Sequence, residues 1–225
     1  MSKISLKHSG GNVVSLNSPT NAPGAADVAF KLPNADGSAG QFMKTDGSGN
    51  LSFDAVAAGG ISMIDTYNLS SSQVMSGAAW NYLKTNFSRV NGAYGTMNVT
   101  GLGTGLSVDN AGSASTFSFP STGYYEISFT ATTYISSSSS SDYLYAGIHI
   151  AKDGSSFDNV VQSIGFIYSS SATVYQTQIA KVIIDVTNTS NDKFYLAVQP
   201  EVASVLLGSN DKFYTFLQVK KLAET

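Results

Sequence analysis

Within the stretch that begins at Phe117, residues 125–132 show a strict alternation of apolar and polar side chains. The side chains of Tyr125, Ile127 and Phe129 are apolar, and the residues between them are polar. A period of two places alternate side chains on opposite faces of a strand. The segment therefore predicts a β-strand with one buried face and one exposed face.

Later segments also predict strands. Residues 143–150 and 180–187 alternate in the same way, and residues 160–168 form an extended apolar run. The motif SNDKFY occurs at residues 190–195 and again at 209–214. In each copy the Asn-Asp pair predicts a turn, and the Phe-Tyr pair predicts the start of a strand. About eight to ten short strands predict an all-β sandwich or barrel, of which the jelly roll is a common form.

The period between residues 61 and 90 is ambiguous. Val74, Ala78 and Tyr82 fit a helical stripe, whereas the positions around Trp80 also suit strands. We favour strands, and leave open whether residues 70–90 form strand or helix.

Residues 1–60 differ in character from the rest of the chain. They contain three of the five prolines and too few apolar residues for a core of their own. Turn signals at Asp46-Gly47 and Gly49-Asn50 lie between residues 41–44 and 51–53, which predicts a hairpin. We expect residues 1–60 to form an extended N-terminal arm and residues 61–225 to form the folded head. A flexible linker is the alternative for the arm.

Charge and composition narrow the range of partners. Only 12% of the residues are charged and the net charge is −3, so we expect no nucleic-acid binding. The sequence contains no cysteine for a disulfide or a thiolate metal site. We find no signal-peptide core and no apolar run long enough for membrane insertion. We therefore expect a protein made in the cytoplasm without a signal peptide.

The candidate chemistry is weak. The glycine-rich residues 101–105 are not followed by the Lys-Ser/Thr of a phosphate loop. His8 and His149 lie far apart in the sequence, and each is expected to be a solvated or packed residue. No Gly-x-Ser-x-Gly motif lies in a strand-to-helix context. Sparse carboxylates such as Asp153 and Glu201 suit turns and surfaces. We expect no enzyme activity, no cofactor and no metal site.

Two serine-rich segments flanked by tyrosines are candidate receptor-facing loops, because hydroxyl and aromatic side chains suit saccharide and protein surfaces. Solvated loops are the simpler alternative. The candidate residues are Ser136, Ser137, Ser138, Ser139, Ser140, Ser141, Tyr143, Tyr168, Ser169 and Ser170.

Residues 32–53, LPNADGSAGQFMKTDGSGNLSF, resemble a segment that recurs in bacteriophage tail-fibre and related virion fibre proteins. In that family the segment lies in a narrow shaft where three chains run side by side. Phe53 stands where the family often has tryptophan, so an aromatic residue is kept. The resemblance implies a virion-attachment role for the arm, with other virion structural proteins as partners.

The head resembles the C1q/TNF-like superfamily. The resemblance rests on four segments in order, residues 117–129, 148–154, 186–198 and 214–219. It implies a C1q/TNF-like jelly-roll β-sandwich that forms a homotrimer. Aromatic residues are then candidates for the core or the trimer interface: Phe119, Tyr124, Tyr125, Phe129, Tyr195, Tyr214 and Phe216.

The two resemblances together imply a phage virion structural protein, such as a tail fibre, spike or capsid decoration. Its trimeric head would bind a glycan or protein on the host surface. A non-phage trimeric adhesive or coat protein is the alternative, and a carbohydrate-cleaving spike is a minor one.

Overall fold

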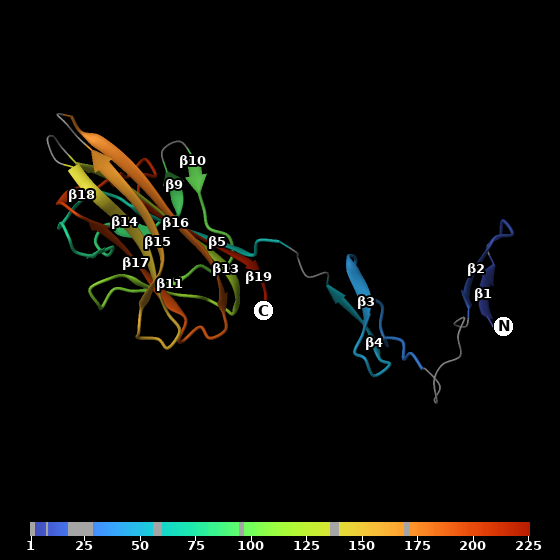
Figure 1. Ribbon diagram of the computed structural model, residues 1–225. Coiled ribbons are helices and arrows are strands. Elements are labelled where there is room, and N and C mark those ends of the chain that lie inside the picture. Colours follow the sequence, from blue (N-terminus) through green and yellow to red (C-terminus); the bar gives the residue numbers. More distant parts are fainter. Residues whose placement is uncertain are drawn as a thin grey trace. The chain divides into compact units, whose positions relative to one another are not determined.

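The computed structural model describes residues 3–7, 9–17, 29–55, 60–94, 97–135, 140–168 and 172–225. The chain divides into two compact units, Met1–Ala58 and Gly59–Thr225 (Figure 1). This division falls beside the boundary expected at residue 60, and residues 56–59 lie outside the described residues. The described ranges contain no helix that is long and apolar enough to cross a bilayer.

The N-terminal unit contains two antiparallel hairpins. Strand β1 (Lys3–Lys7) pairs with β2 (Val13–Asn17), and β3 (Gln41–Thr45) pairs with β4 (Leu51–Ala55). The second hairpin confirms the sequence prediction. The first was not predicted, because its few apolar residues gave no strand signal of their own.

The turn between β3 and β4 follows from its residue types. The Asp46 carboxylate accepts the backbone N–H groups of Ser48 and Asn50 at 2.8 and 3.1 Å. Hydrogen bonds from the Asn50 side chain and from Ser48 lower the pKa of Asp46. Gly47 and Gly49 have φ values of 78° and 88°, which glycine adopts without steric cost. The aspartate and the two glycines together fix the hairpin that the sequence signals.

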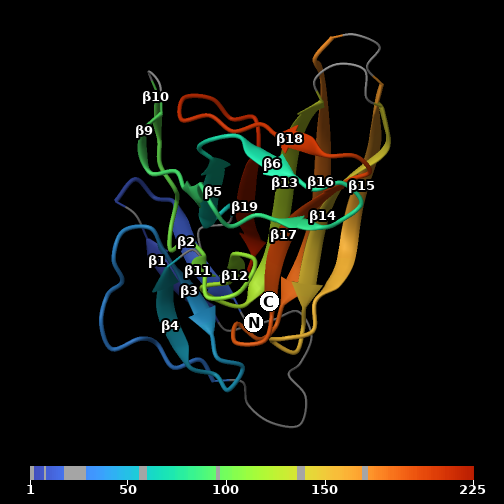
Figure 2. The ribbon, with the colours of Figure 1, turned by 90° about the vertical axis from the view of Figure 1, so that its left-hand side faces the viewer.

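The C-terminal unit, the head, is a sandwich of two antiparallel sheets (Figures 1 and 2). One sheet has six strands: β7 (Asn81–Tyr82), β11 (Ser107–Asp109), β12 (Thr116–Ser118), β14 (Ser140–Ala151), β15 (Asp158–Tyr168) and β17 (Lys193–Pro200). The other has seven: β5 (Met63–Leu69), β6 (Gln73–Met75), β8 (Phe87–Arg89), β13 (Gly123–Ile135), β16 (Val174–Val186), β18 (Ser204–Leu206) and β19 (Phe216–Ala223). A separate short hairpin joins β9 (Gly92–Tyr94) and β10 (Met97–Val99).

The order of the long strands is that of a jelly roll. One sheet runs β12-β17-β14-β15, and the other runs β5-β19-β13-β16. Consecutive long strands therefore alternate between the sheets, except for the β14–β15 hairpin, as in the two nested Greek keys of this architecture. The all-β jelly-roll prediction is confirmed by the strand order of the chain itself.

The core lies between the sheets, where the sequence placed it. The side chains of Tyr125, Ile127 and Phe129 on β13 are fully buried. From the opposite sheet Phe117 and Phe194 stack on each other, with ring centroids 4.9 Å apart. The two-residue alternation thus determined which face of β13 is buried.

Residues 70–90 form β6, β7, β8 and the turns between them. A helix through Val74, Ala78 and Tyr82 is excluded, because Ala78 has a φ of 55°. The Asn81 side chain also bonds the N–H and C=O of Ser76, at 2.8 and 2.9 Å. The open question of strand or helix is resolved in favour of short strands.

The glycine-rich residues 101–105 pack against β5. Leu102 and Ile64 exchange two backbone hydrogen bonds of 2.9 and 3.0 Å. A Cβ atom at Gly103 would lie 2.4 Å from the Ser62 carbonyl oxygen, and one at Gly105 would lie 2.4 Å from Asp65 Oδ2. The glycines allow this close approach, which explains the motif without a phosphate.

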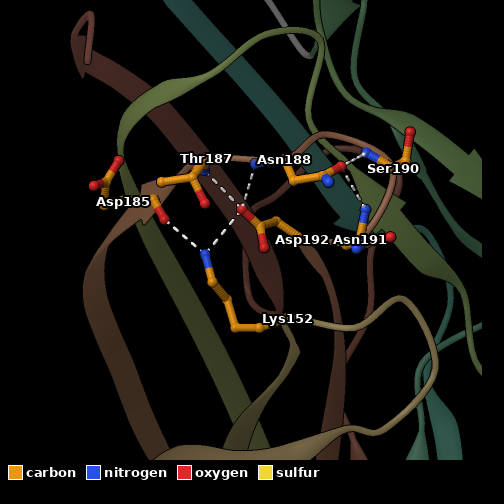
Figure 3. Close-up of polar contacts among 7 residues, drawn as sticks. All are labelled: Lys152, Asp185, Thr187, Asn188, Ser190, Asn191 and Asp192. Atoms are coloured by element: carbon orange, nitrogen blue, oxygen red, sulfur yellow. Dashed lines mark hydrogen bonds and ion pairs between the residues drawn. The ribbon is translucent and has the colours of Figure 1, made fainter.

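The first SNDKFY copy forms a closed turn between β16 and β17 (Figure 3). The buried Asp192 carboxylate accepts the N–H groups of Thr187 and Asn188 at 2.8 and 3.0 Å, and pairs with Lys152 at 2.8 Å. Lys152 also donates to the Asp185 carbonyl oxygen at 2.8 Å. Burial acts to raise the pKa of Asp192, but hydrogen bonds from Lys152 and the two N–H groups outweigh it, so the pKa is lowered.

The prediction for the second copy was wrong. Residues 209–214 form bends, and strand β19 begins only at Phe216. Asp211 is exposed and its carboxylate bonds the Ser209 hydroxyl beside it. In the first copy the equivalent carboxylate, that of Asp192, closes a turn because it is buried and bound by two N–H groups and Lys152. The same six residues therefore take different structures in different surroundings.

Candidate functional site

The two sheets each end in a long strand at the same side of the sandwich. Strand β15 pairs only with β14, and β16 pairs only with β13 among the described strands. The two edge strands lie side by side across the gap between the sheets (Figure 2). Each leaves one row of backbone hydrogen-bonding groups unpaired, which favours contact with another chain.

Large apolar side chains stand on the outer faces of both edge strands. All six are between 57% and 70% exposed. We call this surface the apolar edge, and it consists of Ile164, Phe166 and Tyr168 on β15 with Tyr175, Ile179 and Ile183 on β16. The β15 side chains lie on the outer face of the six-stranded sheet and the β16 side chains on the outer face of the other sheet, so the apolar edge consists of two exposed apolar rows. Exposed apolar surface of this kind is typical of a protein–protein interface.

The charge on the apolar edge is neutralised within the head. Lys181 lies between Ile179 and Ile183 on β16 and pairs with Glu126 at 2.8 Å. Glu126 also pairs with Lys220 at 3.3 Å, and hydrogen bonding to Lys181 is the largest cause of its lowered pKa. A lysine on an edge strand usually opposes association, but this one is already paired.

The two edge strands are held together by a buried amide. Gln178 points inward from β16, and its Oε1 atom accepts the hydroxyl of Ser163 on β15 at 2.9 Å. A Cβ atom at Gly165 would lie 1.9 Å from Gln178 Nε2, so only glycine leaves room for the amide. This contact fixes the spacing of β15 and β16, and with it the apolar edge.

A hollow of about 580 Å³ lies beside Tyr175 on the outer face of β13 and β16. Its floor includes Thr132, whose hydroxyl lies 2.9 Å from that of Thr177 and donates to the Tyr214 carbonyl oxygen at 2.8 Å. The residues that line it are Thr130, Thr132, Tyr175, Thr177, Leu207, Phe213 and Tyr214. The hollow is continuous with the apolar edge through Tyr175.

The predicted loop residues fall into two groups. Residues 136–139 and 169–170 lie outside the described residues. Ser140 and Ser141 begin β14 and pair in register with Tyr168 and Ile167 of β15. Tyr143 stacks on Tyr145 with ring centroids 4.9 Å apart, and the side chain of Tyr168 is 70% exposed. Within the described part, Tyr168 is the predicted loop residue that belongs to the apolar edge.

The predicted aromatic residues divide between core and surface. Phe119, Tyr125 and Phe129 are core residues, and the rings of Phe119 and Tyr125 lie 4.7 Å apart. Tyr124 is exposed, and the side chains of Tyr195, Tyr214 and Phe216 are half-buried.

Sequence reasoning missed most of the apolar edge. Phe166, Ile179 and Ile183 alternate with Ile167, Ala180 and Ile184, so apolar side chains occupy both faces of each strand. Apolar side chains on both faces are typical of strands that are covered on both faces. This pattern was the sequence signal that could have revealed the apolar edge.

The carboxylates considered for sugar cleavage have turn and surface roles. Asp153 accepts the N–H groups of Ser155 and Ser156 at 2.9 and 2.7 Å, and these contacts with Ser156 and Ser155 lower its pKa to about 2. The Glu201 carboxylate accepts the backbone N–H of Asp142.

Comparison with known proteins gives structural likeness without sequence relatives. No family model and no curated protein matches the chain. Among solved structures, Eiger TNF from S. frugiperda is similar with 13% identity and a TM-score of 0.49, over 72% of this chain and 93% of that one. Murine APRIL at pH 5.0 is similar with 13% identity and a TM-score of 0.43, over 71% of this chain and 99% of that one. Murine APRIL at pH 8.5 is similar with 15% identity and a TM-score of 0.42, over 71% of this chain and 99% of that one.

These likenesses are too distant to indicate a function. The strand order of the sheets and the alternation of buried residues establish the architecture independently. The head of this chain is a jelly-roll β-sandwich with an apolar edge along β15 and β16.

Proposed function

We propose that the chain is a bacteriophage virion structural protein whose heads assemble into a homotrimer through the apolar edge. The observation that carries the self-association is the set of six exposed apolar side chains along two unprotected edge strands. Burying them removes apolar surface from water, which stabilises association by about 25 cal/mol per Å².

The proposed contact joins the apolar edge of one copy to the hollow beside Tyr175 of the next. The two surfaces share Tyr175 but are otherwise formed by different residues, so the contact is heterologous. Heterologous contacts give a closed ring when the rotation between copies closes, and three copies are the number that the C1q/TNF-like resemblance implies.

The proposed role of the N-terminal unit is attachment to the particle. Its support is the resemblance of residues 32–53 to virion fibre segments, together with the ordered β3–β4 hairpin that those residues form. A Cβ atom at Gly37, which precedes that hairpin, would lie 2.6 Å from the Phe53 ring on β4, so the retained aromatic residue has a packing role. The head is then free to contact the host surface.

Light scattering tests the association directly. We expect a mass three times the 23.5 kDa of the chain. Phe166→Asp combined with Ile183→Asp places two charges on the apolar edge and should give single chains. Val74→Asp is the matched control, because Val74 is 79% exposed on β6, outside the edge. A wild-type mass of one or two chains would contradict the proposal.

The virion role is tested separately, by mass spectrometry of purified phage particles. We expect this chain as a stoichiometric component that survives washing in high salt. Its absence from particles, in a trimeric protein, would refute the virion role and favour the adhesive or coat protein instead.

A further inference from the structure

A continuous row of aromatic rings crosses the outer face of the six-stranded sheet. We call this row the aromatic platform, and it consists of Tyr143, Tyr145, Trp80, His149, Tyr195 and Tyr82 in that order. Successive ring centroids are 4.9, 6.3, 4.9, 4.6 and 5.4 Å apart. The core below does not require these rings, because Leu144, Ala146 and Ile148 fill the inner face of β14.

The platform is built around Trp80. A Cβ atom at Gly147 would lie 3.0 Å from Trp80 Cη2, so the six-membered ring of the indole rests on the bare backbone of β14. Tyr145 and His149 flank Gly147 on the same face of that strand. A glycine at this one outward position of β14 lets the indole approach the strand backbone closely.

Side-chain amides border the indole. Gln162 pairs in register with Gly147, and Asn159 pairs with His149. Asn159 Nδ2 donates to Gln162 Oε1 at 2.7 Å, and both residues are exposed. A Cβ atom at Gly147 would also lie 3.2 Å from Asn159 Oδ1. Hydrogen-bonding amides therefore stand next to the exposed edge of an aromatic surface.

The platform carries no charge of its own near neutral pH. His149 is the one ring of the platform whose pKa ordinarily lies near neutral pH. Burial lowers the pKa of His149, so its imidazole is neutral. His149 is only 6% exposed, and its Nε2 atom is buried without a hydrogen-bond partner among the described residues. An uncharged ligand with donors and acceptors suits this surface, whereas a phosphate chain would need cations.

We propose that the aromatic platform is a binding site for neutral saccharides. The apolar C–H face of a pyranose ring stacks on Trp80 and Tyr145, and its hydroxyls bond the amides of Asn159 and Gln162. The platform differs in this from the apolar edge, half of which is isoleucine and suits a protein surface. Aromatic walls with a few polar groups are typical of small-ligand sites. The proposal gives the host-attachment role a ligand class. It rests on the proposed function only in that the host surface would be the natural source of the saccharide.

Trp80 is the sole tryptophan of the chain, so its fluorescence reports on the platform alone. The full-length protein is titrated with dextran, mannan, galactan and chitohexaose. We expect a saturable change in emission with at least one of the four. Tyr145→Ala and Gln162→Ala each keep Trp80 and should weaken that binding at least tenfold, while Tyr175→Ala on the apolar edge should leave it unchanged.

Affinity electrophoresis in gels that contain the same polysaccharide provides a second readout. Wild type should be retarded and Tyr145→Ala should not, with equal circular dichroism spectra for both. No saturable change with any of the four probes would overturn the proposal, as would binding that survives both platform variants. Binding to a protein in place of all four saccharides would also overturn it. The Phe166→Asp/Ile183→Asp variant separates the two proposals, since it should lose association and retain saccharide binding.

Discussion

At the scale of single residues, several glycines matter because of what lies against them. Gly147 accommodates the Trp80 indole, Gly103 lies against the backbone carbonyl of Ser62 just before β5, and Gly165 leaves room for the Gln178 amide. The sequence shows these glycines but not their neighbours, which come from other strands. Their roles could therefore not be predicted from local turn signals.

Gly165→Ala should lower the free energy of unfolding by about 2 kcal/mol, because the added Cβ would overlap the buried Gln178 amide, which Ser163 holds in place. Urea denaturation measures the change. Gly112→Ala is the control, since its Cβ would meet nothing closer than 3.9 Å, and a change within about 0.5 kcal/mol is expected. In the double variant Gly165→Ala/Gln178→Ala the overlap is absent. Its loss of unfolding free energy should therefore be smaller than the sum of the losses of the two single variants. Equal stability of the two single glycine variants would contradict this account.

At the scale of elements, alternation predicted the long strands well and the short ones poorly. Strand β13 buries the face that the alternation of residues 125–132 indicated, but Phe117 and Ser118 belong to β12 in the other sheet. Strand β18 has only three residues and was not predicted, because its pairing with β6 and β13 defines it more than its side chains do. The repeated SNDKFY motif shows the same limit, since only the first copy is buried enough to close a turn.

Asp192→Ala should therefore cost about 2 kcal/mol at pH 7, because it leaves two N–H groups and Lys152 without their acceptor. Asp211→Ala, at the same place in the second copy, should leave the stability close to that of wild type, because Asp211 is exposed. Urea denaturation of both variants provides the comparison.

The cost of Asp192→Ala should also depend on pH. The pKa of Asp192 is lowered below its ordinary value of 3.8 in the folded state. The stabilising contribution of Asp192 is thus complete above pH 3.8 and is lost as the pH falls through the lower folded value. The gap between wild type and Asp192→Ala should narrow in that range. A gap that stays constant down to pH 2 would show that the carboxylate charge is not the cause.

At the scale of the whole molecule, the head and the N-terminal unit are separate compact units. The head contains the buried core, the apolar edge and the aromatic platform. Only the apolar edge requires a second copy of the chain, whereas the aromatic platform lies within one head. Association and saccharide binding are therefore expected to be separable by mutation.

Removal of residues 1–58 should leave a head that is folded and still associated. Its core residues all lie in Gly59–Thr225, so the unfolding midpoint in urea should stay close to that of the full chain. Light scattering should give three times the mass of the shortened chain. A shortened chain that is folded but monomeric would place the association in the N-terminal unit instead of the apolar edge.

The amino-acid sequence was sufficient to predict the all-β class, the buried face of β13 and the β3–β4 hairpin. These features depend on side-chain alternation and turn chemistry, which are local. The tertiary structure alone decided which strands are edges, which apolar side chains remain exposed on them, and which rings meet on the outer face of the sheet. Those properties depend on strand order, because residues such as Trp80, Gly147 and Asn159 become neighbours only when distant strands pair.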